Sequence, residues 1–99
     1  SPDILAGNKI RRVAIECKST KNKTQYLTKK EVEDLCFFAK SFGAEPWVAV
    51  RFPSARWYFL NTEDLKDTGK HFSITSEMAQ FKGLIFEELI QKDDSIFSP

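Results

Sequence analysis

Two short apolar runs, each joined to an acidic residue, constrain the fold of this 99-residue chain more than any other feature. Asp3 opens the run 4–6, which ends in Gly7-Asn8, a dipeptide typical of a hairpin turn. The run 13–15 leads directly into Glu16-Cys17-Lys18. This pattern predicts two neighbouring strands joined by a turn, with the second strand spanning residues 10–18.

Alternation of side chains along the second strand groups its polar residues. Residues two apart share one face of a strand, so Glu16 and Lys18 point together and Cys17 points away. If Asp3 ends the neighbouring strand, its carboxylate joins them. Two carboxylates can hold Mg²⁺, which needs only one or two beside a substrate phosphate, and Mn²⁺ is expected to substitute. Lys18 can stabilise charge or orient water, so the group is typical of metal-dependent phosphodiester cleavage.

A simpler explanation exists for the Glu-x-Lys triplet. Most such triplets are surface ion pairs, each worth roughly 0–1 kcal/mol. Here the triplet caps an apolar run, and Asp3 opens another that ends in a turn dipeptide. This context favours the catalytic interpretation.

The charge is distributed unevenly although the net charge is only +1. Residues 9–30 carry eight Lys and Arg residues and a single acidic residue, Glu16, whereas the rest of the chain is acidic. Clustered basic residues beside a carboxylate pair are what phosphate binding requires. A solvated lysine loop is the alternative. The candidates for DNA contacts are Lys9, Arg11, Arg12, Ser19, Lys21, Lys23 and Lys29.

Several blocks of the chain resemble the archaeal Holliday junction resolvases, a branch of the PD-(D/E)xK nucleases. The resemblance lies in residues 2–8, 15–20 and 42–46, with similar order and spacing, and continues through Trp57-Tyr58-Phe59. It implies a restriction-endonuclease-like α/β fold, in which a mixed central β-sheet is flanked by helices. It also implies that Asp3 and Glu16 bind the metal and that Lys18 is the catalytic lysine, with Ser19 following the triplet.

The resemblance also implies parts that this sequence does not contain. Members of the family begin with a helix that carries another catalytic glutamate, followed by a strand and a basic loop. Because Ser1 immediately precedes the motif, residues 1–99 are expected to form a single nuclease domain truncated at its N-terminus.

A helix over residues 29–42 is predicted by a capping box formed by Thr28 and Glu31, with Gly43 as the C-terminal cap. Its sheet-facing residues are expected to be Val32, Leu35, Cys36 and Ala39. A polar loop is expected over residues 19–26, strands at 47–52, 56–60 and 72–74, and a helical turn at 62–65. One closing helix is expected to present Phe81, Leu84, Ile85, Leu89 and Ile90 on a single apolar face.

The predicted 29–42 helix has more apolar surface than one face needs, because Phe37, Phe38 and Phe42 lie outside the main stripe. This surface could be covered by the rest of the same domain. The alternative is a homodimer seam, which the resemblance favours because the family cuts a symmetric four-way junction as a twofold dimer.

Composition excludes other classes. Two cysteines, Cys17 and Cys36, show no metal-binding spacing, and one histidine, His71, gives no support for zinc. Free thiols favour a cytoplasmic location. No apolar run approaches the roughly 20 residues needed to cross a bilayer, so no membrane association is expected.

The predicted function is therefore resolution of four-way DNA junctions by metal-dependent hydrolysis of paired, symmetric phosphodiesters. Two alternatives stay open: a nuclease of the same fold that acts on flaps or nicks, and a non-catalytic DNA-binding or assembly module.

Overall fold

A computed structural model describes residues 2–7 and 11–97, with side chains through residue 91. Its main sheet has the strand order β1-β2-β4-β5, formed by β1 (Ile4–Gly7), β2 (Arg12–Ser19), β4 (Glu45–Arg51) and β5 (Trp57–Asn61). The β2–β4 pair is parallel, whereas β1–β2 and β4–β5 are antiparallel. The mixed central sheet expected from the sequence is therefore confirmed.

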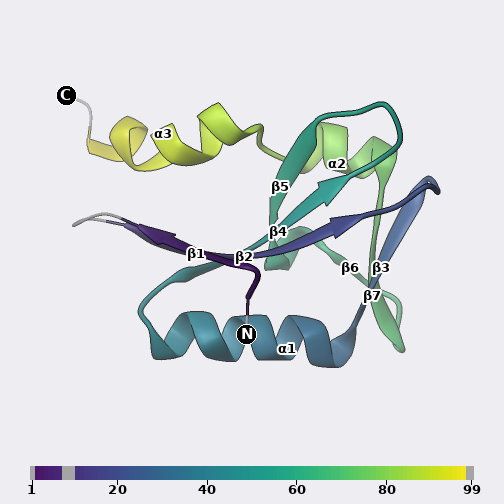
Figure 1. The fold of residues 1–99 in the computed structure, drawn as a ribbon, viewed down its shortest axis with the longest axis horizontal. Coiled ribbons are helices and arrows are strands. Elements are labelled where there is room, and N and C mark those ends of the chain that lie inside the picture. Colours follow the sequence, from purple (N-terminus) through teal and green to yellow (C-terminus); the bar gives the residue numbers. More distant parts are fainter. Residues whose placement is uncertain (1, 8–10, 98–99) are drawn as a thin grey trace.

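Two helices cover opposite faces of the main sheet, as Figure 1 shows. The helix α1 (Lys29–Ser41) lies along one face, and α3 (Phe86–Phe97) lies over the other. Strand β4 is buried on both faces, with Val48 and Val50 in the core on the α1 side and Trp47 and Ala49 in the core on the α3 side. Such two-sided burial is expected for a strand at the centre of a covered sheet.

Helix α1 forms where the sequence predicts it. The Thr28 hydroxyl accepts a hydrogen bond from the Glu31 N–H, and the Glu31 carboxylate accepts one from the Thr28 N–H, which completes the capping box. Val32, Leu35 and Ala39 are buried against the sheet, with Cys36 partly buried beside them. Gly43 follows the helix with a φ of 64°, the left-handed conformation that glycine adopts without strain.

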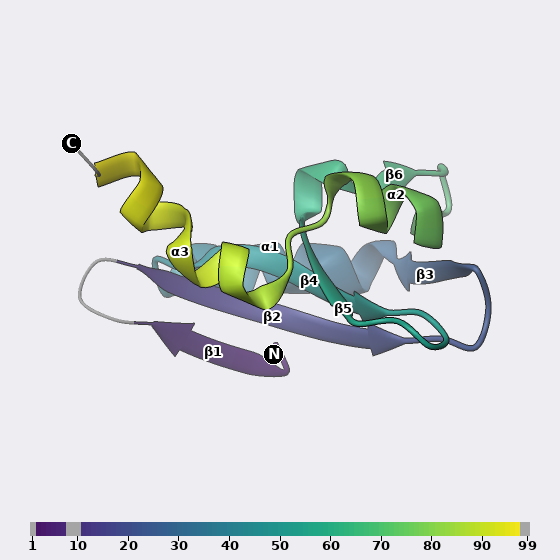
Figure 2. The same cartoon turned by 90° about the horizontal axis from the view of Figure 1, so that it is seen from above.

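A second, smaller sheet begins within the last part of the polar loop expected over residues 19–26. Its strand order is β3-β7-β6, formed by β3 (Thr24–Thr28), β7 (His71–Thr75) and β6 (Lys66–Asp67). It stands at one end of the molecule, beyond the end of β2 (Figure 2). The loop prediction was wrong for residues 24–26, because these residues pair with a strand that lies far along the chain.

The C-terminal part contains two helices where one was expected. Helix α2 (Ser76–Lys82) ends at Gly83, and Leu84 then forms an antiparallel bridge with Phe59, with N···O distances of 2.7 and 2.8 Å. A Cβ atom on Gly83 would lie 2.4 Å from the Ala79 carbonyl oxygen, so only glycine allows this close exit from the helix. The prediction of one closing helix with a single apolar face was therefore wrong. Phe81, which was expected on that face, is 82% exposed.

The remaining elements agree with the sequence prediction. The helical turn η1 (Thr62–Asp64) follows β5, and β7 contains the expected strand at 72–74. The expected turn at Gly7-Asn8 falls partly on residues outside those the structure describes. Within the described residues, no helix has both the length and the apolar character needed to cross a membrane.

Candidate active site

The hairpin of β1 and β2 brings Asp3 and Glu16 together, as the sequence predicts. Asp3 directly precedes β1, and its Oδ2 atom accepts a hydrogen bond of 2.8 Å from the backbone N–H of Cys17. This bond fixes the Asp3 carboxylate beside the middle of β2. The pKa of Glu16 is raised, first by partial burial and then by the negative charge of Asp3, while Lys18 acts in the opposite direction.

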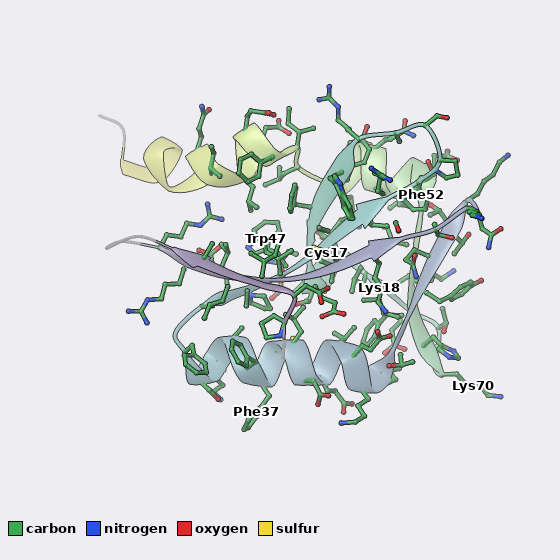
Figure 3. The ribbon with its side chains drawn as sticks, in the orientation of Figure 1. Cys17, Lys18, Phe37, Trp47, Phe52 and Lys70 are labelled. Atoms are coloured by element: carbon green, nitrogen blue, oxygen red, sulfur yellow. The ribbon has the colours of Figure 1, made fainter. Side chains whose placement is uncertain are left out.

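The alternation along β2 separates the site residues from the core on the other face. Figure 3 shows Lys18 pointing from β2 toward α1, whereas Cys17 lies on the side of Trp47. Cys17 packs against the cluster that includes Trp47 and Leu89, and burial raises the pKa of its thiol. Cys17 and Cys36 are both free thiols. The polar residues of the triplet therefore share the face covered by α1.

Glu31 joins this group, although the sequence indicated only its capping role. Its Oε2 atom accepts a hydrogen bond from the Lys18 ammonium, and its Oε1 atom accepts one of 2.8 Å from the Thr28 N–H. Partial burial acts to raise the pKa of Glu31, but the hydrogen bonds from Lys18 and Thr28 outweigh it and lower that pKa. The capping box marked Glu31 in the sequence, whereas the contact between Glu31 and Lys18 depends on how α1 docks on β2.

The carboxylates present suit a metal ion that needs only one or two protein ligands. Among the described residues, no group of three or more His, Cys, Asp or Glu side chains is arranged to hold a metal ion. Asp3 and Glu16 are two carboxylates on adjacent strands. Mg²⁺ retains several waters and takes one or two protein carboxylates beside a phosphate, so this donor pair suits it better than a dedicated protein cage.

The basic residues expected to contact DNA are distributed over two ends of β2. Arg12 begins β2, and its guanidinium donates a 3.1 Å hydrogen bond to the Phe42 carbonyl at the end of α1. Lys21 and Lys23 are exposed beyond the other end of the strand. A strand of this length separates the two ends by about 25 Å, at roughly 3.3 Å a residue. Lys9 lies outside the described residues.

Arg11 has a structural position that the sequence analysis did not anticipate. It is only 9% exposed, and its guanidinium pairs with both carboxylate oxygens of Glu45 at 2.8 and 2.9 Å. It also donates a hydrogen bond to the Leu89 carbonyl of α3. An enclosed guanidinium with these partners is not available to a phosphate, so the expected DNA contact at Arg11 is corrected to a link between β4 and α3.

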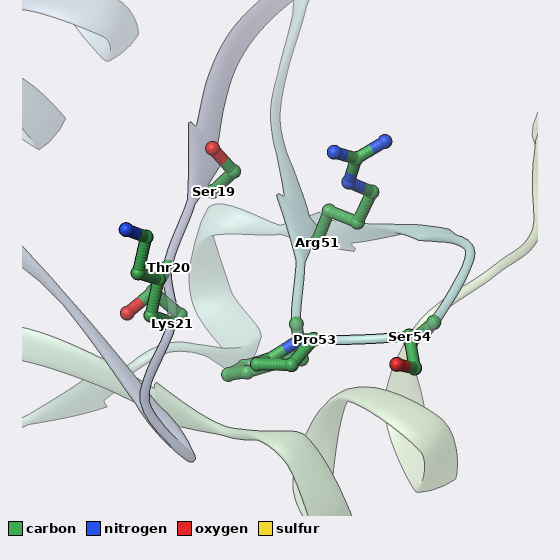
Figure 4. A pocket seen from close by; sticks show the side chains of 8 residues that line it. Ser19, Thr20, Lys21, Arg51, Pro53 and Ser54 are labelled. Atoms are coloured by element: carbon green, nitrogen blue, oxygen red, sulfur yellow. The ribbon is translucent and has the colours of Figure 1, made fainter.

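A polar hollow of about 560 Å³ opens at the end of β2, and its lining begins at Ser19, the residue after Lys18. It is lined by Ser19, Thr20 and Lys21 from one side and by Arg51 and the turn at residues 52–55 from the other (Figure 4). Arg51, which the sequence analysis did not select, also lies over the Trp57 ring, with its Cζ atom 5.5 Å from the ring centroid. Its position on β4 beside Ser19 follows from the parallel register of the two strands.

Lys29 and the residues expected at the dimer interface differ in their burial and their partners. The Lys29 ammonium pairs with Asp67 and lies 4.2 Å from the centroid of the Phe72 ring. Phe37 is 75% exposed and points away from the sheet (Figure 3). Phe38 is partly buried and stacks on Phe42, with a centroid distance of 4.5 Å, while Phe42 is 49% exposed.

The mixed sheet, its flanking helices and the carboxylate–lysine group on β1 and β2 define a restriction-endonuclease-like domain of the PD-(D/E)xK class. The profile of a family described as archaeal Holliday junction resolvase (hjc) matches residues 1–96. This chain belongs to that family.

Individual relatives agree with the family match. The chain is 40% identical over 94 residues to the crossover junction endodeoxyribonuclease Hjc of Archaeoglobus fulgidus, a match that covers 88% of this chain and 69% of the relative. It is 32% identical over 72 residues to the protein of the same name from Methanocaldococcus jannaschii, which covers 73% of this chain and 53% of the relative.

The fold also matches a solved structure of a Holliday junction resolvase, Hjc, from Archaeoglobus fulgidus. The TM-score is 0.83 with 42% sequence identity, and the match covers 89% of this chain and 71% of the other. The similarity therefore extends from local motifs to the path of the backbone.

Proposed function

We propose that this chain is a Mg²⁺-dependent endonuclease that resolves four-way DNA junctions by hydrolysing paired, symmetric phosphodiesters. Membership of the resolvase family supports this function, as do relatives named crossover junction endodeoxyribonucleases. The observation that carries the proposal is the placement of Asp3, Glu16 and Lys18 at one point of the sheet, from two strands. An acidic pair beside a held ammonium is a suitable site for a phosphodiester.

Each site residue has a distinct role in this proposal. Asp3 and Glu16 would hold the metal ion, which, when bound, polarises the scissile phosphate and lowers the pKa of a bound water. Asp3 is oriented by the Cys17 N–H, so its carboxylate does not have to be ordered when the substrate arrives. Lys18 stabilises the negative charge that develops on the phosphate, which is a pre-organised electrostatic contribution.

The duplex arms would be held by basic and polar groups that are exposed or, for Lys29, partly exposed and paired with Asp67. Ser19 and Lys21 line the hollow at the end of β2, and Arg51 faces them from β4. Lys23 and Lys29 extend this surface along β3 and α1, and Arg12 offers a separate contact at the other end of β2. Contacts of this kind position a duplex through its phosphates without reading its sequence.

A homodimer would match the twofold symmetry of a four-way junction. The exposed rings of Phe37 and Phe42 provide apolar surface on α1, and the stacking of Phe38 on Phe42 keeps the latter ring in place. This surface supports the dimer seam that the sequence analysis favoured over coverage within the domain.

A cleavage assay tests the proposed function. A labelled four-way junction is incubated with the protein and Mg²⁺ in the presence of excess linear duplex, and Glu16→Gln and Asp3→Asn serve as controls. The expected result is a pair of symmetric nicks that both variants lose while they retain junction binding. A parallel run with Mn²⁺ should also give cleavage.

The same assay separates the alternatives. Equal cleavage of the junction, a flap and a nicked duplex would contradict the resolvase assignment and favour a repair nuclease of the same fold. Tight junction binding without cleavage at any metal concentration would favour a non-catalytic module. Loss of binding in Glu16→Gln would contradict the assignment of Glu16 to the metal.

A further inference from the structure

We propose that Glu31 is a positioning residue for Lys18, through which the first turn of α1 sets the place of the catalytic ammonium. The inference rests on the proposed function of Lys18. It adds to that function a residue outside the hairpin that carries the rest of the site.

The two oxygens of the Glu31 carboxylate have different partners. Oε1 accepts the Thr28 N–H at 2.8 Å, and Oε2 accepts the Lys18 ammonium. The Glu31 N–H in turn donates to the Thr28 hydroxyl at 3.0 Å. A capping box normally satisfies only the backbone donors at a helix start. Here the same carboxylate, fixed at one oxygen by the backbone, presents its other oxygen to the lysine.

Burial distinguishes this ion pair from the ordinary surface pair on the same helix. The side chains of Lys18 and Glu31 are 26% and 31% exposed, whereas those of Lys30 and Asp34 are 82% and 55% exposed. An exposed pair contributes little, because solvent screens it and both side chains lose conformational freedom. The Lys18–Glu31 pair is shielded on the α1 face of the sheet, where a fixed partner has a larger effect on lysine position.

The position of Glu31 relative to the proposed metal ligands is consistent with a role in the site. Its charge contributes to the raised pKa of Glu16, after burial and the charge of Asp3, so the two carboxylates lie in each other's field. Glu31 accepts from Lys18, which stands two residues after Glu16 on the same face of β2. The first turn of α1 therefore contacts the site through the Glu31 side chain.

Positioning of this kind matters because a lysine has a long, flexible side chain. A catalytic group that is displaced by about 1 Å can lose as much as 10²-fold in rate, even when binding is unchanged. Replacing Glu31 with Gln keeps an oxygen for the Thr28 N–H, because Gln also completes a capping box, but removes the charge that holds Lys18.

The test compares Glu31→Gln with Thr28→Ala and Asp34→Asn. Thr28→Ala weakens the cap but leaves the lysine partner, and Asp34→Asn removes the exposed ion pair of the same helix. We expect Glu31→Gln to lower the single-turnover rate of a prebound junction about 10- to 100-fold with junction affinity unchanged within about twofold. Both control variants should cleave within about threefold of the wild-type rate. Rates for Glu31→Gln and Thr28→Ala that fall equally would overturn the proposal.

A second readout does not depend on cleavage. The side-chain ¹³Cε and ¹⁵Nζ signals of Lys18, measured by NMR in the absence of metal and DNA, should report a restricted ammonium in the wild type. In Glu31→Gln they should become as averaged as those of Lys30. A Lys18 signal that is equally mobile in both proteins would refute the positioning role. Restricted Lys18 in a wild-type protein that cleaves no junction would instead count against the proposed function alone.

Discussion

The two faces of the main sheet are covered to different degrees. On the α1 side, the core cluster contains twelve buried residues of the described chain and extends into the small sheet and α2, and α1 itself is capped at both ends. On the α3 face, the cluster contains five buried residues, and an apolar hollow of about 310 Å³ remains beside Ile4, Phe86 and Ile90. The proposed catalytic residues lie on the better-packed face. Rigid surroundings of this kind hold catalytic groups in place, while the other face retains apolar surface.

The largest difference between the faces should appear when a buried leucine is truncated on each. Leu35 on α1 and Leu89 on α3 are both 2% exposed. Leu35→Ala should lower the free energy of unfolding by about 3–4 kcal/mol, because its site is surrounded by core, and Leu89→Ala by about 2 kcal/mol, because its surroundings can relax into the hollow. Urea unfolding measures both. Equal losses would show that the two faces are packed alike.

Removal of Arg11 should break the link between the α3 face and the sheet. Arg11→Met leaves the Leu89 carbonyl and the Glu45 carboxylate without the guanidinium, and Glu45 is partly exposed and can hydrate. The expected loss in the free energy of unfolding is about 2 kcal/mol, smaller than for a fully buried pair.

The exposed neighbour Arg12 is the matched control for Arg11. Arg12→Met should cost about 0.5 kcal/mol, because it loses one exposed hydrogen bond. If Arg11→Met instead left stability unchanged and weakened junction binding, the structural assignment of Arg11 would be wrong.

Substitution of an exposed aromatic ring on each face tests where the proposed dimer seam lies. We expect Phe37→Ser on α1 to raise the dimer dissociation constant about 10-fold, and Phe86→Ser beside the α3 hollow to leave it nearly unchanged. Phe37 and Phe86 are 75% and 53% exposed, so neither change should alter monomer stability by more than about 1 kcal/mol. Sedimentation velocity over a concentration series measures the effect. Dissociation by Phe86→Ser alone would move the seam to the α3 face.

The smallest expected effect is the loss of folding stability that the ionised Glu16 carboxylate causes on the α1 face. The folded-state pKa of Glu16 is raised, so its ionised form is less favourable in the folded than in the unfolded chain. This cost is present in full above the raised pKa and disappears as the pH falls below the ordinary value of 4.5. Glu16→Gln should therefore raise the free energy of unfolding at pH 7, by less than about 1 kcal/mol because solvent screens the partly exposed group.

Thermal unfolding in the presence of a chelator, at pH 7 and pH 4, checks this prediction. Lys30→Gln, which changes an exposed residue of the same face, is the control. A variant that is no more stable than the wild type at pH 7 would argue against an unfavourable charge on Glu16, which is partly buried and lies near Asp3.

Local signals in the sequence predicted the parts of the fold that short segments determine. The α1 helix follows from Thr28, Glu31 and Gly43, and the facing of Glu16 and Lys18 follows from the two-residue period of a strand. The β3–β7 pair could not be predicted in this way, because it joins segments that lie far apart along the chain. The division of the C-terminal helix at Gly83 accompanies the bridge between Leu84 and Phe59, a contact with a distant strand that no local pattern reports.

The same distinction between local and distant contacts applies to the candidate site. Asp3, Glu16 and Lys18 come together through one hairpin, so their spacing predicted the grouping, and the family resemblance supplied the proposed roles. The contact between Glu31 and Lys18 requires α1 to dock on β2, and the burial of Arg11 requires α3 to pass beside β4. Arg11 and Arg12 are adjacent and chemically alike, so only the tertiary structure separates a structural cation from an exposed one.

The pairing of β3 with β7 has a consequence for the order in which the molecule can be assembled during translation. Leu27 pairs with Phe72, so the strand that leads into α1 has no sheet partner until residues 71–75 have left the ribosome. Contacts between distant segments slow folding, because the chain between them must be ordered before they are gained. The hairpin that carries Asp3 and Glu16 precedes β7 along the chain, so the small sheet forms after it. A nascent chain of this protein should therefore form the β1–β2 hairpin before it can complete the small sheet.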